Sequence, residues 1–186
     1  MTWEISKQFN TCYGHRVYTQ LTNEEFALNR PPKCRHIHGH EGEIHVHLSA
    51  DTLDPNEQMV TDFCNLGWLK KFIDDVIDHK FIFGINDPFF SRLLLEPENK
   101  LVPVVVPDTD HVVGHVFDMS AYKNKESADY EIAEGYLVVD FVPTSENLSK
   151  WMCDLVSAKM QRIGVNVSKV TWWETPKSQS TYINEK

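Results

Sequence analysis

Two histidines, His38 and His40, are the side chains whose type and spacing most directly indicate chemistry in this sequence. On an extended backbone this spacing places both imidazoles on one face of a strand. Two imidazoles on one face, joined by a third from elsewhere, could form an open zinc site with one coordination position left free. Cys34 lies four residues before His38, close enough to sit beside such a metal without having to bind it.

The alternation of the residues after this pair predicts which way each histidine points. If the strand is unbroken, His45 and His47 face away from His38 and His40, and a bulge at Gly42 would break this parity. The first pair would then share the face of three apolar residues, Ile44, Val46 and Leu48. A bare imidazole is unusual on an apolar face, which favours a function for the first pair. The chain contains nine histidines, however, so a histidine-rich surface strand is the alternative.

Composition and charge limit the class of protein. The 186 residues are 41% hydrophobic and 24% charged, as expected for a soluble globular protein with one domain over residues 1–186. A net charge of −9 argues against general binding of nucleic acid or anionic membrane, although a local basic pocket could still bind an anionic substrate. We expect no signal peptide and no membrane span. The four cysteines have no framework spacing, which predicts reduced thiols in a cytoplasmic protein.

Hydrophobic periodicity predicts an α+β chain with an antiparallel sheet and two helices on one face. Strands are expected over residues 2–10, 43–50, 101–106, 111–117, 135–142 and 165–174, the third and fourth forming a hairpin. Amphipathic helices are expected over residues 63–77, after Asp62 as N-cap, and from Thr144 or Ser145 to Gly164. Residues 11–35 are expected to be a loop or a long hairpin connection, residues 123–129 are expected to be a loop, and the tail from Pro176 is polar.

Four blocks of sequence, taken in order, resemble the 6-pyruvoyl-tetrahydropterin synthase / 6-carboxy-tetrahydropterin synthase family. They are Tyr13-Gly14-His15-Arg16, then Lys33 to His40, then Met59 to Phe63 leading to Asp78-His79-Lys80, and last Pro143 to Asn147 with Glu174-Thr175. The three residues between Cys34 and His38-Gly-His resemble the 6-carboxy branch. The blocks cover most of the chain outside residues 84–135, which resemble nothing in compact family members and are interpreted as an insert.

The resemblance implies a role for each matched residue. His15, His38 and His40 would bind Zn²⁺, Cys34 would be the general acid or base, Asp78 and His79 a proton relay, and Glu174 the anchor of the pterin ring. The implied substrate is 7,8-dihydroneopterin triphosphate, and the implied products are 6-carboxy-tetrahydropterin, acetaldehyde and triphosphate. Zinc would acidify the hydroxyls of the substrate, and a cysteine beside a dication favours its thiolate. Three basic residues, Arg16, Lys33 and Arg35, are candidates for binding the triphosphate.

Taken singly, several of these residues have simpler interpretations. His15 could be a turn residue, Asp78-His79 could end a helix, where histidine is favourable, and Glu174 could be a surface carboxylate. His15 also lies further from Phe9 than the family motif has it, so its strand is either bulged or aligned only locally.

The resemblance also implies the tunnelling fold. In that fold each subunit has a four-stranded antiparallel sheet with two helices on one face, and subunits form a homo-oligomeric barrel, a trimer or a hexamer of two stacked trimers. Active sites would lie between subunits. Two other functions stay open: a 6-pyruvoyl-type synthase, and a non-catalytic zinc- or pterin-binding protein whose insert mediates an interaction.

Overall fold

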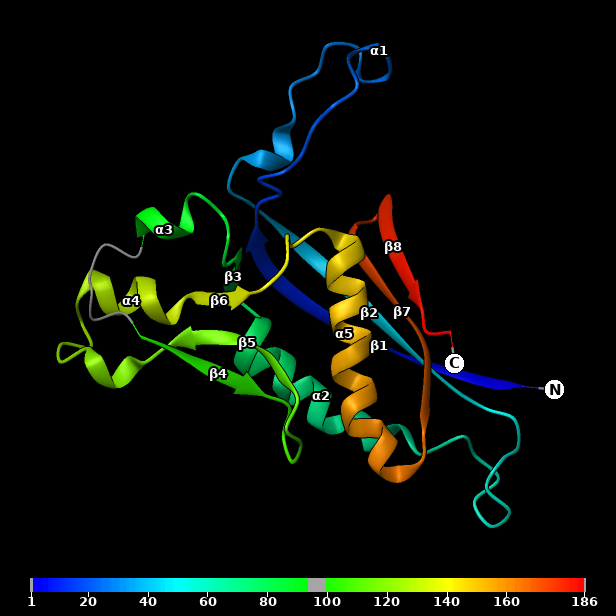
Figure 1. The fold of residues 1–186 in the computed structure, drawn as a ribbon. Helices are drawn as coiled ribbons and strands as arrows, with labels where there is room; N and C mark the ends of the chain where they lie inside the picture. The colour runs from blue at the N-terminus through cyan, green and yellow to red at the C-terminus, as the bar shows by residue number, and fades with distance from the viewer. Residues whose placement is uncertain (1, 94–99, 186) are drawn as a thin grey trace.

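The computed structural model describes residues 2–93 and 100–185, so part of the expected insert, residues 94–99, lies outside the described residues. Eight strands form one mixed sheet in the order β4-β5-β6-β3-β1-β2-β7-β8 (Figure 1). The strands are β1 (Trp3–His15), β2 (His38–Ala50), β3 (Lys80–Gly84), β4 (Leu101–Val105), β5 (Val112–Phe117), β6 (Tyr136–Val139), β7 (Asn166–Thr175) and β8 (Ser178–Ile183). The α-helices are α1 (Glu24–Ala27), α2 (Gly67–Phe72), α3 (Phe90–Leu93), α4 (Ala128–Glu134) and α5 (Ser145–Met160).

One half of the sheet, β1-β2-β7-β8, is antiparallel. β1 and β2 pair without a register shift from Trp3–Ala50 to His15–His38, so there is no bulge at Gly42 and the predicted parity of β2 is confirmed. β1 runs past the predicted end at residue 10 and reaches His15, and burial continues to alternate up to that residue. The expected loop over residues 11–35 therefore begins only after β1.

The other half of the sheet corrects the expectation of a four-stranded antiparallel sheet. β3 pairs parallel with β1, and β6 pairs parallel with β3. The predicted hairpin is present as β4 and β5, and it joins the sheet where His115 pairs with Val138 of β6. The fold class is α+β, and the region after β3, which was interpreted as an insert, extends the sheet. Within the loop expected over residues 123–129, Ser127 caps α4, accepting from the Tyr130 amide at 3.2 Å.

Two helical segments cover one face of the sheet and share its core. The predicted helix over residues 63–77 is a 3-10 turn η2 (Phe63–Leu66), then α2, then a π-helical turn η3 (Ile73–Ile77), with Asp62 capping the Cys64 amide at 2.6 Å. α5 is capped by Thr144, continues as a 3-10 turn η5 (Gln161–Ile163), and stops at Gly164, whose φ of 71° is left-handed.

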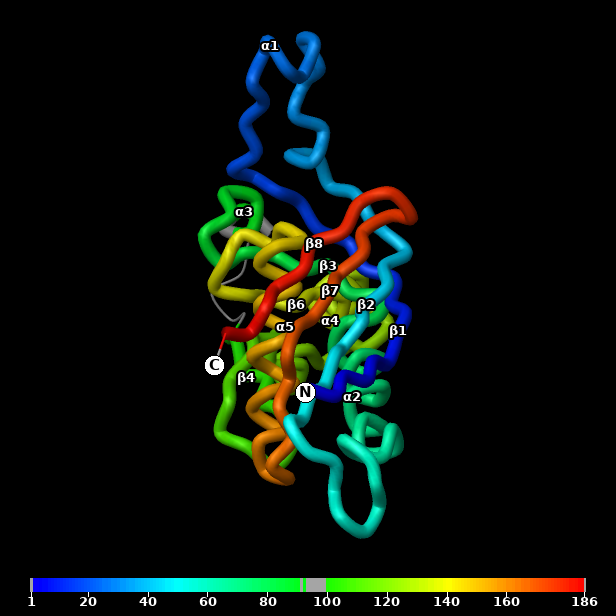
Figure 2. The backbone as a smooth tube through the Cα atoms, turned by 90° about the vertical axis from the view of Figure 1, so that its right-hand side faces the viewer, coloured from blue at the N-terminus to red at the C-terminus, as the bar shows by residue number. Residues whose placement is uncertain are grey.

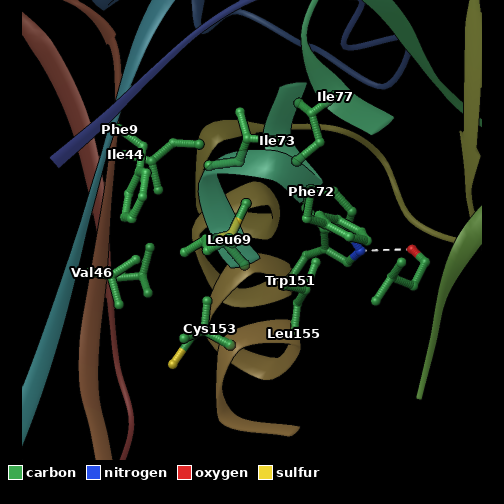
Figure 3. Close-up of a cluster of buried hydrophobic side chains, with 14 of the residues drawn as sticks. Phe9, Ile44, Val46, Leu69, Phe72, Ile73, Ile77, Trp151, Cys153 and Leu155 are labelled. Atoms are coloured by element: carbon green, nitrogen blue, oxygen red, sulfur yellow. Dashed lines mark hydrogen bonds between the residues drawn. The ribbon is translucent and has the colours of Figure 1, made fainter. Parts of the chain in front are cut away.

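The core lies between these helices and the inward face of β1 and β2. Figure 3 shows Leu69, Phe72 and Ile73 meeting Trp151 and other buried side chains from the sheet and α5. The indole of Trp151 donates to the Val113 carbonyl at 2.7 Å, which fixes α5 to the β4-β5 hairpin.

The segment between β1 and β2, residues 16–37, projects beyond the end of the sheet as an arm with α1 at its tip (Figures 1 and 2). A 3-10 turn, η1 (Lys33–Arg35), lies on its return path. Leu21, Phe26 and Leu28 on the arm are exposed. Among the described residues, no helix has the length and apolar character that crossing a membrane requires.

Candidate metal centre and active site

Paired positions on β1 and β2 bring three histidines together. His15 lies directly opposite His38, and His40 is two residues further along β2 on the same face. Their ring centroids are 4.6 Å apart for His15 and His38, and 5.0 Å apart for each of the other two pairs. One nitrogen of each ring lies within 4.8 Å of the others, so the three could hold one metal ion.

His15 is the buried member of this histidine triad, with 1% of its surface exposed. Its Nδ1 lies 2.6 Å from the Pro143 carbonyl, which fixes the proton there and leaves the Nε2 lone pair facing the other two rings. Burial is the largest influence on the pKa of His15 and lowers it to about 4, so the ring is neutral at pH 7. His38 is oriented in the same way, by its Nδ1 at 2.8 Å from the His36 carbonyl.

These observations fit zinc well. Zinc binds neutral imidazole nitrogens, and a carbonyl at the second ring nitrogen is the usual support for such ligands. The neutral form of His15 and the two carbonyl contacts supply both requirements. Three protein ligands leave a coordination position for a substrate, the arrangement typical of catalytic zinc.

Tyr13 packs against two of the three histidines, and the sequence analysis did not identify it as a residue of the site. Its ring centroid lies 5.4 Å from that of His15 and 5.7 Å from that of His40. Its buried hydroxyl accepts a 2.9 Å hydrogen bond from the indole of Trp172. The signal was present in the alternation of residues 9 to 15, whose odd-numbered members face inward.

Glu174 lies beside the triad at the end of β7. Its Oε1 is 3.6 Å from His15 Nε2, and burial raises the pKa of the carboxyl. Glu174, His40 and Trp173 line a hollow of about 620 Å³, which lies within the size range of small-molecule sites. The carboxylate, an indole and the candidate metal centre therefore border one space.

A second hollow of about 570 Å³ also borders the histidines. His38, His40 and His79 line it together with Cys12 and Phe81. His40 therefore lines both hollows and His38 the second one, and His79 reaches the second hollow from the turn after η3.

Asp78 and His79 form a hydrogen-bonded pair in that turn. His79 Nδ1 lies 2.6 Å from Asp78 Oδ2, and the imidazole is 80% exposed. Asp78 Oδ1 accepts from the Cys12 amide at 2.7 Å and from the Thr11 hydroxyl at 3.2 Å. Partial burial raises the pKa of Asp78, but the Cys12 amide, His79 and Thr11 outweigh it and the net pKa is lowered. The sequence analysis missed Thr11 and Cys12.

His79 also has an unusual backbone, with φ of 58°. Left-handed conformations are costly for residues other than glycine and cluster at functional sites. The His79 amide donates to the Cys12 carbonyl at 2.6 Å, which holds the turn against β1.

Cys34 lies in η1 at the base of the arm and is partly exposed. Its amide donates to Gln20 Oε1 at 2.8 Å, and its carbonyl accepts from the Val17 amide at 2.7 Å. Cys34 is not among the described residues that line the two hollows beside the triad. The structure therefore brings together His15, His38, His40 and Glu174, and places His79 at the rim, but leaves Cys34 on a separate segment.

The three basic residues that are candidates for binding the triphosphate differ in their exposure. Lys33 and Arg35 are exposed on either side of Cys34. Arg16 is buried against Asp87 and Phe89, so its guanidinium is not free to bind a triphosphate.

Comparison with known proteins identifies the family. Residues 4–185 match the family described as 6-pyruvoyl tetrahydropterin synthase. The chain belongs to this family. It is 31% identical over 194 residues to the 6-carboxy-5,6,7,8-tetrahydropterin synthase of Aquifex aeolicus, covering 100% of both chains. The human 6-pyruvoyl tetrahydrobiopterin synthase is 29% identical over 105 residues, which cover 53% of this chain and 69% of the human one. The match to the Aquifex synthase thus spans the region 84–135, so this region is not foreign to the family.

Solved structures of similar fold are also known. An uncharacterized protein from Wolinella succinogenes superposes with a TM-score of 0.89 at 41% identity, over 100% of this chain and 99% of that chain. The 6-pyruvoyl tetrahydropterin synthase of Caenorhabditis elegans superposes with a TM-score of 0.56 at 21% identity, over 100% of this chain and 97% of that chain. The second likeness supports the tunnelling fold alone.

Proposed function

We propose that this member of the 6-pyruvoyl tetrahydropterin synthase family is a zinc-dependent 6-carboxy-5,6,7,8-tetrahydropterin synthase, a carbon–carbon lyase of the cytoplasm. It would convert 7,8-dihydroneopterin triphosphate and water to 6-carboxy-tetrahydropterin, acetaldehyde and triphosphate, for queuosine and 7-deazaguanine biosynthesis. The observation that carries the proposal is the convergence of three histidines beside the half-buried carboxylate of Glu174. Full-length similarity to the Aquifex 6-carboxy synthase supports this product.

His15, His38 and His40 would hold the zinc through one ring nitrogen each. When bound, zinc would polarise the side-chain oxygens of the substrate and acidify its hydroxyls. The chain prepares for this by keeping His15 neutral and by fixing the Nδ1 of His15 and of His38 against carbonyls.

Glu174 would bind the pterin ring. A carboxylate can accept two parallel hydrogen bonds, here from the 2-amino group and the N3–H of the pterin, more strongly than a neutral side chain can. Glu174, Trp173 and His40 all line the 620 Å³ hollow, so we propose that the ring binds there and reaches the triad from it.

Asp78, His79 and Cys34 would move protons on the substrate side chain. Asp78 holds His79 at Nδ1, so Nε2 is free to take or give a proton. Cys34 would remove a C–H proton as the thiolate. Because it lies on the arm, we propose that a homo-oligomer, a trimer or hexamer, completes the site, as the family's active sites between subunits imply.

The test is an assay of the zinc-loaded protein with 7,8-dihydroneopterin triphosphate, with products resolved by mass spectrometry. We expect 6-carboxy-tetrahydropterin, lost in Cys34→Ala and retained in Cys64→Ala, a control at an exposed cysteine on another segment. A 6-pyruvoyl product would assign the other branch of the family. No turnover by a zinc-loaded oligomer would overturn the enzymatic proposal and favour a pterin-binding protein.

A further inference from the structure

Arg16 directly follows the candidate metal ligand His15, and its side chain is buried instead of exposed. Only 5% of Arg16 is accessible, and its partner Asp87 is 1% accessible. Arg16 Nε lies 3.3 Å from Asp87 Oδ2, and the guanidinium carbon lies 3.6 Å from the centroid of the Phe89 ring. The end of β1 is therefore clamped by an ion pair and a cation–π contact.

Asp87 is itself held firmly, in the loop between β3 and α3. Its Oδ1 accepts from the Phe89 amide at 2.8 Å, and its own amide donates to the Gly84 carbonyl at 2.9 Å. Two residues earlier, the Ile85 amide donates to the Val139 carbonyl of β6 at 2.8 Å. After Asp87, the chain is held by Phe90, which is 2% exposed and packs in a small core with Phe83 and Phe117. The region 84–135 thus begins with a rigid support for Arg16.

The ion pair of Arg16 and Asp87 is not explained by a contribution to folding stability alone. Within the described residues, Arg16 Nε and Nη1 and Asp87 Oδ2 find no well-aligned hydrogen bond. A buried ion pair with unsatisfied donors is usually no more stabilising than apolar residues of similar size. Its geometry, however, fixes the backbone beside His15, the ligand that the Pro143 carbonyl holds from the other side at 2.6 Å.

We propose that Asp87 is a positioning residue for His15: through Arg16 it holds the end of β1, so that His15 Nε2 stays aimed at the metal. The inference rests on the proposed zinc site, but not on the identity of the substrate. It gives the region 84–135 a role at the metal centre, because its first loop supplies the support.

The experiment measures metal affinity without any substrate. Zinc would be titrated into metal-free protein against a chromophoric chelator, and the visible spectrum of the Co²⁺ form would be recorded. For Asp87→Asn we expect zinc affinity to fall about tenfold, at the lower end of the effect of groups that orient metal ligands, with a changed Co²⁺ spectrum. The control is Asp75→Asn, which breaks an exposed ion pair with Lys71 and should change neither.

A second variant separates positioning from stability. Asp87→Asn leaves the Arg16 charge buried and unpaired, which lowers thermal stability. The double variant Arg16→Met/Asp87→Asn removes both charges, so we expect thermal stability to recover while zinc binding stays weak. If either variant binds zinc as tightly as the unsubstituted chain and only its thermal midpoint falls, the pair is purely structural and the inference is wrong. If the unsubstituted chain itself fails to bind zinc, the proposed function fails first.

Discussion

The candidate metal ligands and the proton-transfer candidates occupy regions that are built in opposite ways. The three histidines lie on two long strands paired without a register shift, with His15 fully buried. His79 lies on an exposed turn, and Cys34 lies at the base of the projecting arm. The difference shows that the candidate metal ligands are held in place within a single chain, whereas the groups proposed to move protons lie on peripheral segments. Metal binding and catalysis should therefore be separable by substitution.

The largest effect should come from the rigid region. His40→Ala removes one of three candidate ligands, so we expect zinc affinity to fall more than about 100-fold, beyond what loss of a supporting contact causes. Turnover should disappear with the metal. His45→Ala is the matched control, because His45 is on the same strand but faces the other side, next to Glu43. Elemental analysis after dialysis measures the zinc bound per chain in both variants. A His40→Ala protein that still carries zinc would show that the triad is not the metal site.

His79→Gly should have the opposite profile, with activity lost and metal binding retained. General acid–base groups contribute about 10²- to 10⁴-fold, so we expect kcat to fall within that range. Glycine accepts the positive φ of this position, so the free energy of unfolding should change by less than about 1 kcal/mol. Steady-state kinetics and urea unfolding check the two parts. Undiminished kcat would mean that Asp78 and His79 merely end the helical segment.

Glu174→Gln tests a residue that lies beside the histidine triad but is not proposed to bind the metal. We expect pterin affinity and kcat/KM to fall about 10- to 100-fold, because charge-assisted hydrogen bonds are worth roughly 1.5–3 kcal/mol. Zinc content should not change. Glu43→Gln is the control, since Glu43 lines the same hollow but lies away from the triad on the opposite face of β2. Equal losses in the two variants would show that overall charge matters and not the position of Glu174.

The sequence predicted best where local pattern decides the structure. Alternation alone placed His38 and His40 on the inward face of β2, and capping chemistry located Asp62 and Gly164 at the ends of helical segments. These features depend on neighbours within a few residues. The third histidine needed the family resemblance, because nothing local shows that His15 lies opposite His38.

Long-range pairing explains what the sequence did not reveal. β3 is short, and it becomes a strand by pairing with β1 and β6 from elsewhere in the chain. β8 is largely polar, and it becomes a strand by pairing with β7, which precedes it in a hairpin. The contacts of Asp78 with Thr11 and of Arg16 with Asp87 join residues that are far apart in the sequence. No periodicity in the sequence encodes such contacts.

The smallest predicted effect is the pH dependence of the Asp78 contacts. The pKa of Asp78 lies below its ordinary value of 3.8, so its contribution to stability is present above about pH 4 and is lost as pH falls through the lowered pKa. The difference in unfolding free energy between the unsubstituted chain and Asp78→Asn should therefore be constant near neutral pH and shrink below about pH 4. Because Asp78 is partly exposed, the pH-dependent part should not exceed about 1 kcal/mol. Urea unfolding of metal-free protein at several pH values measures it, and Thr11→Val should remove part of it by deleting one donor to the carboxylate. A difference that grows as pH falls would show that these contacts do not favour the ionised carboxylate, and Asp78 could not then hold His79 for proton transfer.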